Sequence, residues 1–426
     1  MKSISSSVAS AATPSAVPAR LRNAWNLQHP LWLCGFRPFF LLSALSAAFL
    51  MIFWSIALWF GLPPPPVVGG MLVWHAHELL FGFVLAAVAG FALTAVPEFT
   101  ENHDTSRSAV RWLVLLWLLG RVGFWLSGTL GSAALVLAAL AHVGLLLGLL
   151  WLLGPMMWRD PQRKHVAFFW AFLALLLTIA GFYVDALRGV APARWLFAFL
   201  GVMMTLIVIA MSRVSIVLVN DAIAEIGVKG VEYLARPPRR NLAIFCIAAY
   251  TIAEFFAPAS KLSGWLALAA AAGLFNLLND WHIGRALFRR WALMPYMVYL
   301  FMALGYGVMG WAILAHSPAF SAGRHLLTVG GLGLSTYVVI CIAGRMHCGY
   351  TLDERIWLPL GATLLVCAAL LRAGVALPGA NAALLMAAAG LCWVVAYLLC
   401  VLYLWPLFMR PRPDDGAGCA GPVVRV

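Results

Sequence analysis

Two histidines and a glutamate lie close together at the start of an apolar stretch, in the run Trp74-His75-Ala76-His77-Glu78. Imidazole is a ligand for copper, iron and zinc, and a carboxylate such as that of Glu78 often holds the second ring nitrogen of a ligating histidine. Successive helical residues are about 100° apart, so His75 and His77 would point to nearly opposite sides of a regular helix. We expect them to bind one metal only if this turn is not helical, and otherwise to serve different partners.

A second pair of histidines frames a later apolar stretch. His325 and His347 are 22 residues apart, or roughly 33 Å along a helix, which is close to the thickness of the bilayer's hydrocarbon core. They cannot share a metal. If the helices that carry them run in the same direction, His75, His77 and His325 share one outer layer, and a metal or haem can be held there. A second, inner site would use His347 with Cys348 or Met346.

Two further ionisable residues fall inside apolar stretches, where an unpaired charge is costly. Arg121 needs a partner, and a haem propionate, the carboxylate of Glu254 or a purely structural bond between helices would each serve. His142 is either a ligand or a buried hydrogen-bonded group. The sequence leaves these alternatives open.

The composition requires a membrane. Of the 426 residues, 64% are hydrophobic and only 10% are charged, where a soluble domain carries about 25% charged residues.

The eight cysteines are scattered and suggest no disulfide framework, zinc site or covalent haem attachment. We expect an all-α, polytopic helical bundle in contact with the lipid bilayer.

Apolar runs bounded by charged, Pro-rich or Gly-rich breaks predict about twelve membrane-spanning helices. The predicted spans are 39–61, 72–96, 110–128, 132–155, 166–187, 195–219, 241–258, 262–279, 294–315, 325–344, 356–373 and 381–408.

The basic residues report orientation. With twelve spans, 22 of the 28 Lys and Arg fall on the side of the termini, five fall on the other side and Arg121 lies within a span. Cytoplasmic loops carry such an excess, so both termini are predicted to be cytoplasmic. The formal net charge of +13 is explained in this way, and no nucleic-acid partner is needed.

The predicted organisation is one membrane domain between two tails. Residues 1–30 are expected to be a disordered cytoplasmic tail, 31–410 the transmembrane domain and 411–426 a cytoplasmic tail. The domain divides into possible halves at 31–219 and 241–410. The joining segment 220–240 mixes apolar and charged residues. Two alternatives are open for it: an interfacial amphipathic helix, or a simple link between the halves.

Several blocks resemble the NnrS family. They are Gly35-Phe36-Arg37-Pro38-Phe39-Phe40-Leu41-Leu42, Trp74-His75-Ala76-His77-Glu78-Leu79-Leu80-Phe81-Gly82-Phe83, Gly90-Phe91 with Thr94-Ala95-Val96-Pro97, Leu118-Leu119-Gly120-Arg121, His325-Leu326-Leu327-Thr328-Val329-Gly330 and His347-Cys348-Gly349.

The resemblance implies a multi-pass protein of the bacterial inner membrane that binds haem b and copper. It also implies a role in the response to nitric oxide and in resistance to nitrosative stress, by binding the gas or protecting metal centres. By this analogy the metal ligands are His75, His77, Glu78, His325 and His347. The resemblance also places Arg121, together with His75, His77 and His325, at the cofactor. No catalytic residue is assigned.

Two other functions compete with this interpretation. One is a redox enzyme similar to haem–copper oxidases, acting on NO or O2, but the chain has no paired His-His on one helix. The other is a transporter of metal or another small solute, with helices broken by Pro and Gly around a cavity.

Overall fold

The computed structural model describes residues 24–414 except 64, 162 and 228–229, together with residues 416, 418 and 419. These described residues form helices joined by short loops, without strands. The helices of the bundle are α1 (Phe36–Phe60), α2 (Gly70–His77), η3 (Glu78–Val84), α3 (Leu85–Phe99), α4 (Arg107–Trp125), α5 (Ser127–Leu130), α6 (Ser132–Arg159), α7 (Val166–Leu187), α8 (Ala193–Glu225), α9 (Pro237–Phe256), α10 (Lys261–Leu278), α11 (Arg290–Leu314), α12 (Phe320–His325), η6 (Leu326–Gly333), α13 (Leu334–Met346), α14 (Trp357–Gly374) and α15 (Ala382–Phe408).

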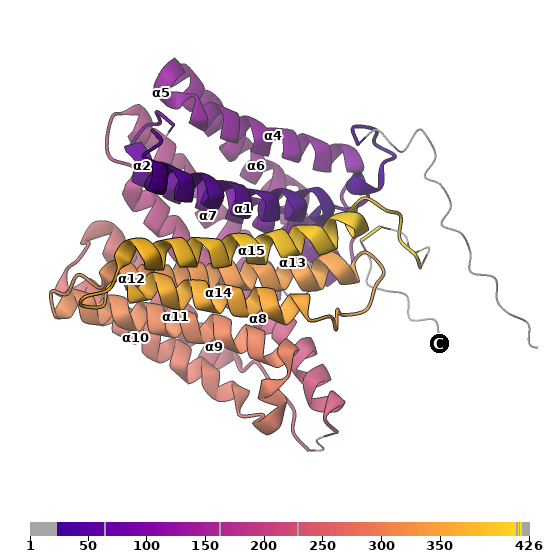
Figure 1. Ribbon diagram of the computed structural model, residues 1–426. Coiled ribbons are helices and arrows are strands. Elements are labelled where there is room, and N and C mark those ends of the chain that lie inside the picture. The colour runs from indigo at the N-terminus through magenta and orange to yellow at the C-terminus, as the bar shows by residue number, and fades with distance from the viewer. Residues whose placement is uncertain are drawn as a thin grey trace, which may run out of the picture.

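Among the described residues, eleven helical stretches are long and apolar enough to cross a bilayer. The stretch that falls short is α9, which has 20 residues and carries Arg239, Arg240 and Glu254. It packs between α8 and α10 like the other helices (Figure 1). The first span begins at the same end of the bundle at which the last span ends. This follows from the positions of Cys34, just before α1, and Cys419, after α15, whose Cα atoms are 5.5 Å apart. Only an even number of crossings allows this, so α9 also crosses the membrane, as the seventh of twelve spans in chain order.

The predicted all-α membrane bundle is therefore confirmed. We call the end of the bundle that holds Cys34 and Cys419 the terminal end, and the opposite end the far end. The last helix, α15, packs against α1 and α14 (Figure 1), so the N-terminal and C-terminal helices are neighbours.

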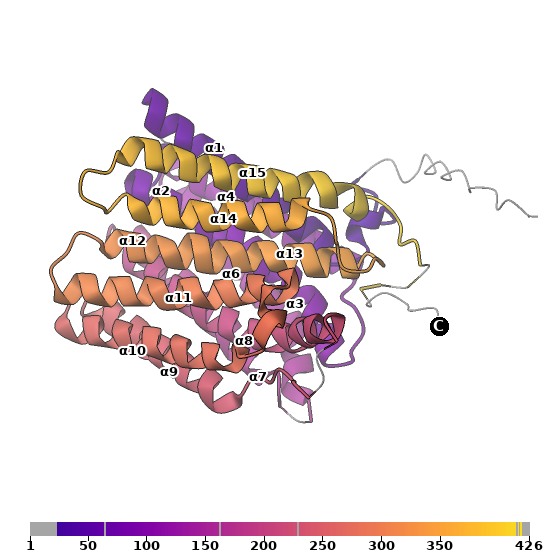
Figure 2. The same cartoon turned by 60° about the horizontal axis from the view of Figure 1, so that its bottom comes forward.

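Two spans lie at the centre of the bundle. The second span is the continuous run α2–η3–α3, and the tenth span is α12–η6–α13. In their most apolar windows 89% and 78% of the residues are buried, against 39–67% in the other spans. Figure 2 shows the tenth span running between α11 and α14, and both helices contact η6. The two spans that carry the candidate histidines are thus the two best shielded from lipid.

Each central span contains a π-helical segment. The π segment η3 follows directly after His77, and η6 follows directly after His325. Wider turns release backbone carbonyls, which need other donors in a membrane. Trp117 Nε1 donates to Gly82 O at 3.0 Å, and the Tyr397 hydroxyl donates to Gly333 O at 2.8 Å. Such segments are frequent at functional sites.

The segment between the two possible halves forms no helix of its own. Residues 220–225 extend α8, the described residues of 226–236 form no helix and α9 begins at Pro237. Of the two alternatives for 220–240, this arrangement agrees with a simple link. A long amphipathic pattern also fits a helix end followed by a packed loop, and the Tyr233 side chain is buried. Most of the predicted disordered tail, 1–23, lies outside the described residues.

The expectation that the cysteines form no disulfide is wrong. Cys34 and Cys419 are bonded to each other across 385 residues of sequence. Part of the C-terminal tail is consequently fixed to the start of the first span.

Candidate functional site

Two candidate imidazoles lie at the far end, one on each central span. His75 lies in α2, and its ring packs against the Trp54 ring of α1, with 4.0 Å between the centroids. His325 ends α12. Arg372, near the end of α14, is within electrostatic range of both histidines.

The His325 ring is oriented by its own helix. Its Nδ1 donates to the Ser321 carbonyl at 2.7 Å, so the proton lies on Nδ1 and the Nε2 lone pair is available. This is the usual arrangement of a metal-binding histidine. No hydrogen bond holds the His75 ring, and no carboxylate pairs with Arg372, within the part of the chain that the structure describes.

His77 points elsewhere, as the helical spacing predicts, because α2 is a regular helix up to His77. It is fully buried. Its Nδ1 lies 3.0 Å from Glu78 Oε1 and its Nε2 lies 3.0 Å from the Tyr183 hydroxyl of α7. Both ring nitrogens of His77 are therefore occupied by protein partners.

These contacts belong to a closed ring of five side chains. The Tyr183 hydroxyl lies 2.6 Å from His142 Nδ1 of α6. Arg121 of α4 contacts His142 Nε2 through NH2 and Glu78 Oε1 through NH1, the latter at 2.9 Å. We call His77, Glu78, Arg121, His142 and Tyr183 the buried polar ring.

The chemistry of the donors fixes where the protons lie. Arg121 is always protonated and only donates, so His142 Nε2 accepts and His142 carries its proton on Nδ1. That proton is donated to the Tyr183 oxygen. The Tyr183 O–H then donates to His77 Nε2, and the His77 Nδ1–H donates to the Glu78 carboxylate. Both imidazoles are neutral in this arrangement, and the charges of Arg121 and Glu78 compensate one another. Among the described residues, the buried Arg121 Nε has no hydrogen-bond partner.

Two glycines let the polar ring close. A Cβ atom at Gly82, in the π segment, would lie 2.8 Å from Arg121 NH1, and a Cβ at Gly120 would collide with the His142 ring. Both positions are buried. The absence of a side chain at these two positions allows a guanidinium and an imidazole to approach the helices closely.

Glu254, one of the partners considered for Arg121, is paired differently. Arg121 pairs with Glu78, whereas Glu254 of α9 forms an ion pair with Arg324 of α12. Sequence spacing could not distinguish the two carboxylates, because the choice depends on which helices are neighbours.

His347 is remote from the other candidates, just beyond the end of α13 at the terminal end. Its Nδ1 donates to Cys419 O at 2.5 Å, and its Nε2 lies 3.6 Å from Glu98. Burial lowers the pKa of His347, although the Glu98 carboxylate acts in the opposite direction. The separation of His347 from the far-end histidines agrees with the helical rise.

Three residues had no role assigned from the sequence: His142 and Tyr183 of the buried polar ring, and Arg372 at the far end. His142 could be a ligand or a buried hydrogen-bonded group, and the structure shows that it is hydrogen-bonded. Tyr183 and Arg372 carried no signal, since each is a single polar residue near the end of an apolar run. Only the packing of helices distant in sequence reveals them.

The fold and the two clusters define a multi-pass helical membrane protein with imidazoles buried between its central spans. A family model described as "NnrS protein" matches residues 30–412, nearly the whole chain. The chain belongs to the NnrS family. No curated protein matches it.

Proposed function

We propose that this protein binds haem between His75 and His325 and acts in the response to nitric oxide as a gas-binding or metal-protecting protein of the bacterial inner membrane. The observation that supports the proposal is the presence of two imidazoles and an arginine, from three helices, within electrostatic range at the far end. Family membership supports the link to nitric oxide in general.

The donor set suits a haem group. Haem iron takes imidazole as an axial ligand, and the porphyrin carries carboxylates. His325 offers Nε2, because Nδ1 is held by Ser321, and His75 has no competing hydrogen bond among the described residues. Arg372 supplies a positive charge for a carboxylate. Bound haem would supply an iron atom that takes diatomic gases.

The buried polar ring fixes the orientation of α2, the helix that carries His75. His77 follows His75 in α2 after one residue, and its hydrogen bonds to Glu78 and Tyr183 fix the rotation of that helix. Trp54 packs against the His75 ring and limits its rotation. In this account His77, Glu78 and Arg121 position the site, and His75 and His325 contact the group.

Copper receives weaker support. No group of three or more His, Cys, Asp or Glu side chains is arranged to hold a metal ion among the described residues. Copper sites in proteins commonly use three such ligands. We therefore assign no residues to copper and leave its presence to direct elemental measurement.

The proposal is tested on the full-length protein purified in detergent. We expect a Soret absorption band, about one iron per chain and a shift of that band when NO is added without oxygen. His325→Ala should lose most of the band. The control is His316→Asn, because His316 is an exposed loop residue between α11 and α12 with a φ of 53°, which Asn tolerates. A purified protein without Soret absorption after haem supplementation would overturn the proposal.

A further inference from the structure

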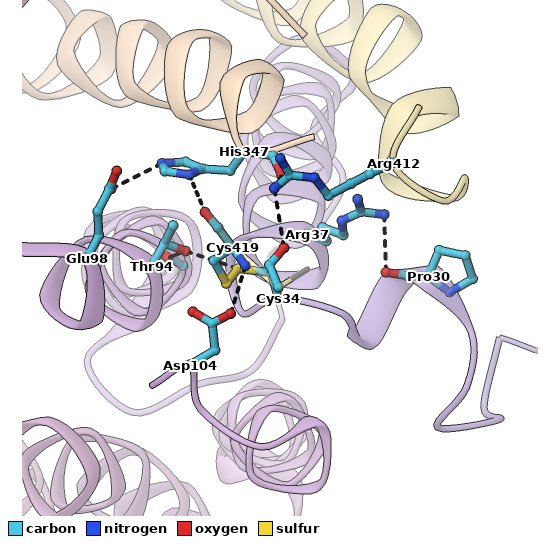
Figure 3. The surroundings of a disulfide bond; sticks show 11 residues. Pro30, Cys34, Arg37, Thr94, Glu98, Asp104, His347, Arg412 and Cys419 are labelled. Atoms are coloured by element: carbon cyan, nitrogen blue, oxygen red, sulfur yellow. Dashed lines mark hydrogen bonds and ion pairs between the residues drawn. A yellow bond between two sulfur atoms is a disulfide. The ribbon is translucent and has the colours of Figure 1, made fainter. Parts of the chain in front are cut away.

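The disulfide between Cys34 and Cys419 joins two distant parts of the chain at the terminal end. Cys34 lies in the turn before α1, and Cys419 lies in the segment that follows α15 (Figure 3). Both residues are buried, with 2% and 3% exposure. Among the described residues, the other six cysteines are free.

The segment that carries Cys419 is also held by polar contacts. We call the described residues of this segment, 411–414, 416, 418 and 419, the C-terminal strap. Its Cys419 N–H donates to Asp104 at 2.8 Å, and its Cys419 carbonyl accepts from His347 Nδ1. Arg412 donates to the His347 carbonyl at 3.3 Å and pairs with Asp414. Figure 3 shows Cys419 between His347 and Asp104, beside Cys34 and Thr94.

The start of the first span is tied to the same region. The buried Arg37 guanidinium donates to the carbonyls of Pro30, Phe408 and Arg410, the last at 2.7 Å. The ends of the chain therefore meet through backbone carbonyls whether or not the two sulfur atoms are bonded. The cysteines are held near one another, so a disulfide can form or break without a new fold.

The distribution of basic residues indicates the side of the membrane on which this pair lies, and therefore its redox environment. The terminal end carries the excess of Lys and Arg, which places it on the cytoplasmic side. Thiols are kept reduced in the cytoplasm, and the disulfides that do form there are mostly transient and sense redox changes. A structural disulfide would be expected on the other side of the membrane.

We propose that Cys34 and Cys419 form a reversible redox site, which is a dithiol in unstressed cells and a disulfide under oxidative or nitrosative stress. The oxidant is a low-molecular-weight disulfide. One protein thiolate attacks it, forms a mixed disulfide and releases one small thiol. The second protein thiolate then displaces the second small thiol and closes the Cys34–Cys419 bond. Two protein thiols are oxidised and one small disulfide is reduced to two thiols.

The consequence of oxidation is a fixed strap. With the bond closed, the strap covers His347 and the start of α1. With the bond open, the strap has no covalent link to the start of α1 and is held by non-covalent contacts such as those of Asp104, His347 and Arg412. Oxidation therefore changes the exposure of the cytoplasmic face.

The neighbouring Cys348 is not a competing site. Its thiol contacts the Leu407 carbonyl at 3.8 Å, and burial raises its pKa to about 11. A neutral thiol is a poor nucleophile. Cys348 lies at the same end of the molecule and provides a matched control.

The test uses full-length protein in growing cells. Cells are quenched in acid, free thiols are blocked with N-ethylmaleimide under denaturing conditions, and reversibly oxidised thiols are then reduced and labelled with a 5-kDa maleimide. We expect no labelled thiols before stress and two after treatment with diamide. Cys34→Ser and Cys419→Ser should each reduce the two labelled thiols to at most one, because the remaining thiol can form a mixed disulfide but cannot close the bond, and Cys348→Ala should leave both labels intact.

A second measurement follows the strap itself. Endoproteinase Glu-C in phosphate buffer, which also cleaves after aspartate, should cut after Asp414 at least several-fold faster in reduced wild type than in oxidised wild type, and equally fast in Cys419→Ser under both conditions. The proposal is overturned if the pair is fully oxidised in unstressed cells, or if it stays reduced after diamide treatment. Equal cleavage of the reduced and oxidised forms would overturn the strap's role.

Discussion

The Tyr183 hydroxyl lies 3.0 Å from His77 Nε2, so a residue of α7 holds the ring of a residue in α2. The same hydroxyl accepts from His142 Nδ1 at 2.6 Å. One oxygen atom thus connects three spans inside the apolar core. Because Tyr183 is only 2% exposed, water cannot replace it without entering the bundle.

Removing that oxygen should destabilise the bundle. Tyr183→Phe leaves His77 Nε2 and His142 Nδ1 without partners, and each buried unsatisfied group costs about 1–3 kcal/mol. We expect a lower midpoint of thermal unfolding in detergent. Tyr299→Phe is the matched control, because its buried hydroxyl has no hydrogen-bond partner among the described residues. If both variants unfold at the same temperature, the hydroxyl of Tyr183 does not connect the spans.

A methyl group at Gly120 should disturb the same polar ring. Gly120→Ala drives the His142 imidazole away from Arg121, because the new Cβ would overlap that ring. In the control Gly144→Ala, the nearest atom is Leu116 Cδ1 at 3.7 Å, and removing a helical glycine stabilises by about 0.5–1 kcal/mol. Thermal unfolding should therefore separate the two variants in opposite directions. Stabilisation of the protein by Gly120→Ala would contradict the packing described.

The arginine at the far end should contribute to haem binding. Arg372→Gln removes a charge that faces His75 and His325, and the loss of one charge-assisted contact of about 1.5 kcal/mol weakens affinity roughly tenfold. The measurement is a haem titration of the apoprotein followed at the Soret band. Arg188→Gln is the control, since Arg188 is exposed at the same end. Equal weakening in both variants would indicate a non-specific charge effect.

The Asp353 carboxylate, in the loop after α13, should stabilise the terminal end. Its contribution to the free energy of unfolding should not change with pH near neutrality. Burial raises the pKa of Asp353, but hydrogen bonds from Arg355 and Trp357 outweigh this and hold the pKa at about 2. A depressed pKa stabilises the folded state above the unfolded value of about 3.9, and this stabilisation is lost as the pH falls toward 2.

Asp353→Asn is accordingly expected to lower the free energy of unfolding by about 1–3 kcal/mol. The deficit should be the same at about pH 6 and pH 8 in chemical unfolding of detergent-solubilised protein, and should shrink below about pH 4. A deficit that grows as the pH falls from 8 to 6 would assign the effect to another group, such as a histidine.

Hydropathy was sufficient to predict most of the fold. The interval 166–187 coincides with α7, and other predicted spans differ from the observed helices mainly at their ends. The divergent directions of His75 and His77 also followed from helical geometry alone. These features depend on neighbours in sequence, which the sequence displays directly.

The features that were missed depend on distant contacts. The π segments η3 and η6 leave the apolar pattern unchanged, so periodicity does not reveal them. The choice of Glu78 as the partner of Arg121 depends on how α4 packs against the second span. The Cys34–Cys419 bond joins residues that only the meeting of α1 and α15 brings together.

The central claim is that His75 and His325 hold one haem. It is tested most directly by haem affinity in wild type, His75→Ala, His325→Ala and the double variant. If both histidines contact the same group, each single variant loses affinity and the double variant loses less than the sum of the two free-energy changes, since ligands of one group are coupled. Wild-type affinity in either single variant, or strictly additive losses in the double variant, would contradict the claim.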